Sequence, residues 1–133
     1  MSYLFDTNIC IYIIKNKYKQ IAKKMQEAGL EKICISAITV AELEYGISKS
    51  SKKDENRIAL LEFLIPFTVL NFDQNDARKY GQIRYNLQKA GTPIGNMDLL
   101  IGSQALARDM TLITNNEKEF SRIQGLKIEN WIK

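Results

Sequence analysis

The chain has 133 residues, of which 45% are hydrophobic and 26% are charged, and its formal net charge is +4. This length is sufficient for a core of its own, so we expect a single domain over residues 1–133. The chain contains no histidine, which excludes Ser-His-Asp and Cys-His catalysis and histidine-containing zinc sites.

The first predicted strand is Tyr3–Phe5, which ends at an acid, Asp6. The apolar run 9–14 behind it predicts a helix capped from the Asp6–Asn8 segment. Ligands of open α/β sheets bind outside the carboxyl ends of strands, so Asp6 lies where chemistry is expected. For this residue taken alone, the pattern favours a purely structural role as an N-cap.

The rest of the chain alternates strands with helices. The predicted helices are Tyr18–Ala28, Ile38 to about Ser48, Glu55–Leu64, Asn75–Ala90 and Asn96–Asp109, with a helical turn at Lys118–Arg122. The predicted strands are Ile33–Ser36, Phe67–Leu70, Thr111–Thr114 and an edge strand at Leu126–Glu129. This alternation indicates an α/β fold, a parallel sheet of about five strands with helices on both faces. We expect Trp131 to pack against the body of the domain and the polar run 48–54 to be a flexible loop.

The sequence shows no targeting or membrane segment. Asp6 interrupts the N-terminal apolar run, and no apolar segment approaches the ~20 residues that span a bilayer. Cys10 and Cys34 both lie among isoleucines, which indicates reduced core thiols, although a disulfide or a shared metal stays possible for the pair. We therefore expect a cytoplasmic protein without membrane contact.

Asp98 lies on a predicted helix that is apolar almost all round. Its neighbours on the helical wheel are Ile101, Gly102 and Ala105, which predicts that Asp98 is carried into the interior. An isolated buried carboxylate is costly, so Asp98 needs a cation: Arg84, a lysine or a metal ion.

Glu42 shows the same pattern on the helix that begins near Ile38. It lies opposite the apolar face of that helix, on a second apolar side that includes Ile38 and Tyr45. We expect this second side to meet a cleft or another chain. Glu44 is predicted to be an exposed partner for a lysine.

A polar segment follows the fourth predicted strand, at a position equivalent to that of Asp6. Either Glu119 or Glu117 could point into the same cleft, with Thr114 and Asn116 as hydrogen-bonding partners. Three or four acids that meet there would repel one another strongly, and all-oxygen ligands favour Mg²⁺ or Mn²⁺. Such ions activate water at phosphodiesters, and the clustered lysines would attract nucleic acid. A metal-free binding module, with the acids paired to Arg84, Arg108 and lysines, is the alternative.

Four segments in register resemble the VapC toxins, which are PIN-domain ribonucleases. They are Leu4–Asn8, Ser36–Gly46, Gly91–Ile101 and Thr114–Phe120. The resemblance implies a three-layer, Rossmann-like fold and a Mg²⁺- or Mn²⁺-dependent endoribonuclease. Such an enzyme cleaves RNA with metal-activated water and leaves a 5′-phosphate and a 3′-hydroxyl. It also implies a substrate among structured RNAs, including tRNA.

The resemblance also implies the site residues. Asp6, Glu42 and Asp98 match the acidic positions of the family. Many relatives have an aspartate where this chain has Asn116, and toxins with the Asn-Asn form use the later acid, here Glu119. The resemblance leaves open whether the acids bind one metal ion or two. Supporting positions, which would orient water, ligands or phosphate, are Thr7, Asn8, Thr114, Asn115 and Asn116.

The partners implied are a VapB-type antitoxin, a second copy of the chain in a homodimer, and operator DNA reached only through the antitoxin complex. The antitoxin would cross the groove and cover the acids, against the side around Ile38 and Tyr45 and the Tyr12–Ile14 helix. A PIN-like RNA-processing nuclease without an antitoxin is a further alternative.

Overall fold

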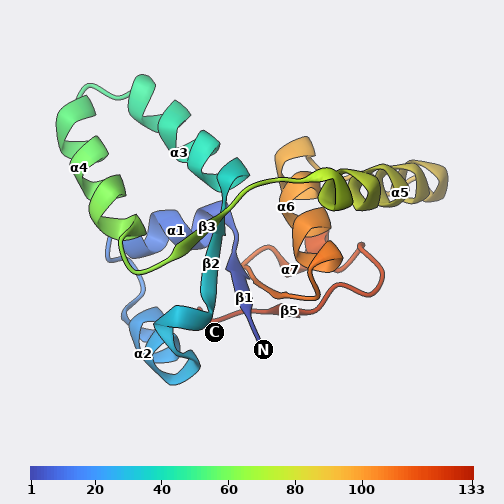
Figure 1. Ribbon diagram of the computed structural model, residues 1–133, viewed down its shortest axis with the longest axis horizontal. Helices are drawn as coiled ribbons and strands as arrows, with labels where there is room; N and C mark the ends of the chain where they lie inside the picture. Colours follow the sequence, from blue (N-terminus) through green and yellow to red (C-terminus); the bar gives the residue numbers. More distant parts are fainter.

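A parallel sheet of five strands forms the centre of the protein in the computed structural model, which describes residues 1–133 (Figure 1). The strand order is β3-β2-β1-β4-β5, and each neighbouring pair is parallel. The strands are β1 (Tyr3–Phe5), β2 (Ile33–Ser36), β3 (Thr68–Leu70), β4 (Thr111–Ile113) and β5 (Ile128–Glu129). The predicted α/β architecture is confirmed, and β5 is an edge strand as expected.

Helices follow the strands as the sequence predicts. They are α1 (Thr7–Ile14), α2 (Lys19–Ala28), α3 (Ala37–Ser48), α4 (Lys53–Leu64), α5 (Gln74–Ala90), α6 (Asn96–Ala107) and α7 (Glu117–Phe120). Most bounds differ by one or two residues from the predicted ones, and a 3₁₀ turn at Leu30–Lys32 was not predicted. None of these helices has the length and apolar character that crossing a membrane requires.

The two faces of the sheet carry separate cores because strand side chains alternate between faces. On one face Leu4 and Leu112 pack with residues of α5 and α6. On the other, Phe5, Ile35 and Ile113 pack with residues of α1 and α2. The domain is therefore a three-layer sandwich.

The last residues close the second of these cores. Trp131 is 4% exposed, and its ring centroid lies 5.3 Å from that of Tyr3 and 5.5 Å from that of Phe5. The predicted packing of Trp131 is confirmed.

The two cysteines belong to different cores. Cys10 is buried in the core beneath α1, whereas Cys34 packs against the core on the opposite face of the sheet. Both are free thiols, so the possibility of a disulfide between them is wrong.

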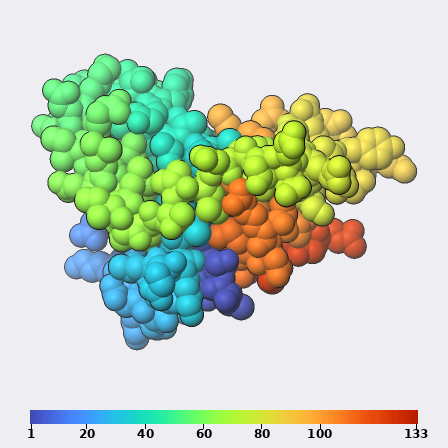
Figure 2. Space-filling view, viewed as in Figure 1, coloured from blue at the N-terminus to red at the C-terminus, as the bar shows by residue number.

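The strand order creates a switch point beside β1. The chain places β2 and then β3 on one side of β1, and then crosses to place β4 on the other side. Ligands of such sheets bind outside the carboxyl ends of the strands at the switch point. Here that position is occupied by the residues that follow β1 and β4. In Figure 2 the α3–α4 pair projects on one side of the molecule and α5 on the other.

Candidate active site

Asp6 has both of the roles that the sequence left open. As the N-cap of α1, its Oδ1 accepts a hydrogen bond of 2.9 Å from the backbone N–H of Ile9. Its Oδ2 accepts one of 2.5 Å from the hydroxyl of Thr114, which follows β4. Asp6 is 3% exposed. Burial raises the pKa of the Asp6 carboxyl, and the charge of the nearby Glu42 raises it further. The two hydrogen bonds lower this pKa and so partly offset the rise.

Glu42 reaches the same region from α3. The hydroxyl of Thr7 donates a hydrogen bond of 2.5 Å to Glu42 Oε1, and Thr7 Oγ1 lies 3.2 Å from the hydroxyl of Thr39. Thr39 is fully buried and was missed by the sequence reasoning. Its position three residues before Glu42, on the same side of a helix, was the available signal.

Asp98 lies in the first turn of α6, where it is half-buried instead of enclosed in the interior as predicted. The reason is that the buried stretch of α6 begins at Leu99, while its N-terminus opens onto the switch point. Burial, together with the negative charges of Glu119, Asp6 and Glu42, raises the pKa of Asp98 to about 6. The four acids therefore lie close enough to influence one another.

Glu119 is the fourth acid of this cluster. The backbone N–H of Gly95 donates to its Oε1 at 2.9 Å and the amide of Asn116 to its Oε2 at 3.2 Å. The bond from Gly95 is the main cause of a lowered pKa for Glu119. The neighbouring Asp98 also lowers the pKa of Glu119. Asn116 thus positions the later acid, and the other candidate, Glu117, turns away to pair with Lys133 at 2.8 Å.

No lysine or arginine nitrogen lies within 4.0 Å of Asp6, Glu42, Asp98 or Glu119, so none forms an ion pair with the cluster. The charge of Arg122 lowers the pKa of Glu119 from a greater distance. The arginines considered as ion-pair partners are engaged elsewhere.

Arg108 pairs with Asp76 at 3.0 Å, and Arg84 donates to the hydroxyl of Tyr80 at 2.9 Å. The ion pairs with arginine required by the metal-free alternative are therefore absent. Glu44 is partly exposed, with 42% of its side chain accessible, and its partner is Arg57 instead of the predicted lysine.

The four acids match the chemistry of a hard divalent cation, which prefers carboxylate oxygens. A cation would also offset the repulsion that raises the pKa of Asp98. In the present arrangement no three acidic or cysteine side chains are grouped so as to hold an ion. Both oxygens of Asp6 and of Glu119 and one oxygen of Glu42 accept local hydrogen bonds, which ion binding would partly replace.

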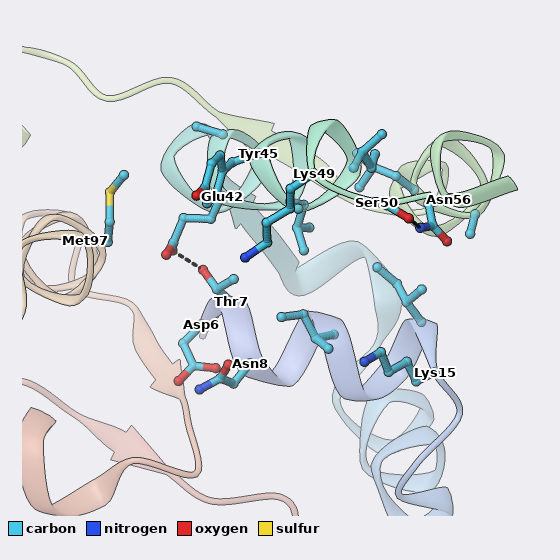
Figure 3. A pocket seen from close by; sticks show the side chains of 18 of the residues that line it. Asp6, Thr7, Asn8, Lys15, Glu42, Tyr45, Lys49, Ser50, Asn56 and Met97 are labelled. Carbon is cyan, nitrogen blue, oxygen red and sulfur yellow. Dashed lines mark hydrogen bonds between the residues drawn. The ribbon is translucent and has the colours of Figure 1, made fainter. Parts of the chain in front are cut away.

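The acids lie at one end of a cavity of about 890 Å³ between α1, α3 and α4 (Figure 3). Asp6, Glu42 and Asp98 line it, together with Thr7, Asn8 and Asn116. Of the predicted supporting residues, Thr114 instead holds Asp6. Asn115 is exposed, and its side chain accepts a hydrogen bond from Asn130.

The apolar residues of α3 and α1 that were predicted to meet a cleft or another chain have two different locations in the structure. Tyr45 and Ile14 line the cavity, whereas Ile38 and Tyr12 pack against the two cores. The apolar lining also includes Ile11, Leu43, Ile47 and Leu60.

Comparison with known proteins identifies the family. The PIN domain family matches residues 3–126. Ribonuclease VapC2 of Rickettsia felis is 46% identical over 135 aligned residues that cover 100% of both chains. The chain belongs to the VapC branch of the PIN-domain family. The tRNA(fMet)-specific endonuclease VapC of Salmonella typhimurium is 39% identical, over 98% of each chain.

Solved structures agree with this assignment to the VapC branch. A chain in the crystal structure of VapBC2 from Rickettsia felis, bound to a DNA fragment from their promoter, superposes with a TM-score of 0.92. It is 43% identical over 98% of this chain and 99% of that one. A chain of DNA-bound VapBC from Salmonella typhimurium gives 0.93 at 39% identity, over 98% of both chains. The resemblance stated from the sequence is confirmed.

Proposed function

We propose that this chain is the toxin of a type II toxin–antitoxin system and cleaves RNA as a metal-dependent endoribonuclease, built as a single PIN domain over residues 1–133. The observation that carries the proposal is the cluster of Asp6, Glu42, Asp98 and Glu119 at the switch point, with no protein cation within 4.0 Å of any of them. Full-length relatives named as ribonucleases and as a tRNA-specific endonuclease support the same chemistry.

In this proposal the four acids hold Mg²⁺, for which Mn²⁺ can substitute. A bound ion of this kind supplies an activated water and offsets negative charge at the phosphate. The protein's own contribution is to fix the carboxylates. Thr114 and the N-terminus of α1 hold Asp6, and Thr7 holds Glu42. The products are a 5′-phosphate and a 3′-hydroxyl.

The proposed partners are a VapB-type antitoxin, a second copy of the chain, and operator DNA through the antitoxin complex. VapBC complexes bound to DNA among the solved relatives support these partners. The apolar lining of the cavity beside the acids offers an antitoxin segment a surface from which to cover them. The substrate that we favour is tRNA, as the name of the Salmonella relative suggests.

Cleavage by the purified chain tests the proposal. Labelled RNA should be cut in Mg²⁺ or Mn²⁺ and left intact in EDTA, and the new ends should carry 5′-phosphates. Sequencing those ends after brief induction in cells would identify the RNA. Cleavage at an unchanged rate in EDTA, or products with 3′-phosphates, would contradict the mechanism.

A further inference from the structure

One side of α3 continues from the acid cluster along the cavity wall. Glu42, Tyr45, Gly46 and Lys49 recur at helical spacing, so they lie on the same side of the helix. All four line the cavity. In Figure 3 the side chains of Glu42, Tyr45 and Lys49 extend from α3, which lies above α1 in this view.

Tyr45 is a large ring that the fold leaves open to solvent. It is 67% exposed and belongs to neither core. Lys49 Nζ lies 4.9 Å from the centroid of the ring, which is a cation–π contact. Beside it, a Cβ added at Gly46 would meet no atom within 4 Å outside its own stretch of helix, so the cavity wall is open at Gly46.

Two lysines line this cavity, and neither has an acidic partner. Lys49 extends from the end of α3, and Lys15 follows the end of α1 on the opposite wall (Figure 3). No carboxylate oxygen lies within 4.0 Å of either ammonium group. Unpaired cations beside an exposed ring suit a nucleic-acid strand, in which phosphates alternate with bases.

We propose that Tyr45 stacks on an unpaired base of the RNA substrate, next to the scissile phosphate, while Lys49 and Lys15 contact phosphates that follow along the groove. The inference rests on the proposed function and adds the residues that position the strand. Stacking requires a base that is free of its own helix, so the groove should select loops or single strands over duplex.

Equilibrium binding in EDTA tests the inference without cleavage. The probe is a fluorescent single-stranded RNA of roughly 12 nucleotides, with its duplex form for comparison. Tyr45→Ala should weaken single-strand binding about 5- to 150-fold, and Tyr45→Phe should stay within about twofold because it keeps the ring. Tyr85→Ala is the matched control, since Tyr85 is 64% exposed and lies outside the cavity.

The salt dependence of the same binding tests the lysines. Lys49→Gln and Lys15→Gln should each lower the slope of log affinity against log salt by about 0.7, the value for one phosphate contact on a single strand. Lys24→Gln, on an exposed position of α2 outside the cavity, should leave the slope unchanged. All these side chains are exposed, so the variants should melt at the wild-type temperature.

The outcomes separate this inference from the proposed function. Normal RNA binding by Tyr45→Ala, in a protein that still cuts RNA with Mg²⁺, would overturn the stacking role alone. If the substitutions at Tyr45, Lys49 and Lys15 weaken only the binding of a VapB-type antitoxin, these residues form a protein-binding surface and the inference is wrong. A wild-type chain that neither binds nor cuts RNA would overturn both.

Discussion

At the scale of single residues, Asp6 shows how one side chain serves both the fold and the site. One oxygen caps α1 and the other receives the hydroxyl of Thr114. The cap ties the residue to its helix and Thr114 ties it to β4, so the carboxylate is fixed before any ligand arrives. The sequence favoured a cap for Asp6 alone, and the additional role became visible only from Glu42 and Asp98.

Substitution of Asp6 should separate these two roles. Asp6→Asn keeps a good N-cap and should lower RNA cleavage by at least about 100-fold, because a ligand charge is lost. Its free energy of unfolding should stay near that of the wild type. Asp6→Ala should lose the same activity and also about 1 kcal/mol of stability, the usual value of a cap. Cleavage assays and urea melts measure the two effects, and wild-type activity in Asp6→Asn would refute the assignment.

Asp98 provides a prediction about pH in the absence of metal. Its folded-state pKa of about 6 lies above the ordinary value of 3.8, so proton binding favours the folded state. The stabilisation of the fold by this proton binding is fully present below the ordinary pKa of 3.8 and is lost as the pH rises through about 6. Asp98→Asn mimics the protonated form, and in EDTA at pH 7 it should be more stable than the wild type. We expect about 1 kcal/mol after allowing for solvent screening.

Thermal melting at several pH values checks this expectation. The advantage of Asp98→Asn should fade below about pH 4, where the wild-type carboxyl is protonated in both states. Mg²⁺ should then raise the melting temperature of the wild type more than that of the variant. An Asp98→Asn protein that is less stable than the wild type at pH 7 would show that Asp98 is a structural partner instead of an uncompensated charge.

At the scale of elements, α5 and α6 are joined by a polar network that the sequence indicated only in part. The sequence shows Gln104 and Arg108 as a polar stripe on α6. In the structure this stripe binds Asp76 of α5, which is fully buried. Burial alone would raise the pKa of Asp76, but the hydrogen bonds from Arg108 and the backbone of Asp73 hold it below its usual value.

Removal of Asp76 should therefore destabilise the fold without touching the site. Asp76→Ala leaves Arg108 and Gln104 without their acceptor and should cost about 2–4 kcal/mol at pH 7. A carboxyl whose pKa is lowered by folding stabilises the folded state at any pH above its ordinary pKa. This stabilisation is lost as the pH falls through the pKa of the folded state. Urea melts should thus show the difference narrowing below about pH 4. A loss of less than about 0.5 kcal/mol would contradict this account of the network.

The elements themselves could be predicted because each is marked locally. Strands such as Ile33–Ser36 are short apolar runs, and Gly91 ends α5 with a left-handed φ of 74°. The choice between Glu117 and Glu119 could not be made from local pattern, since it depends on the rotation of a four-residue helix; only the family resemblance favoured Glu119. Lys15 and Lys49 belong to the lysine clusters expected to attract nucleic acid, but their place beside the acids could not be predicted, because only the tertiary fold puts α1 and α3 on opposite walls of one cavity.

At the scale of the whole molecule, the strand order gathers four distant acids in one place. Asp6 and Glu119 are separated by more than 100 residues in the chain, yet each influences the ionisation of Asp98. The fold holds them at the switch point without a counter-ion of its own, and the adjoining cavity carries the cations and the ring suited to a strand of RNA. The central claim is that a divalent ion supplies the missing charge.

Calorimetric titration of Mn²⁺ into the free chain tests that claim most directly. We predict saturable binding to the wild type, strongly weakened in Asp98→Asn, while the control Asp54→Asn, on the exposed start of α4, binds as the wild type does. Absence of Mn²⁺ binding in a folded wild-type chain that retains its affinity for RNA would contradict the account.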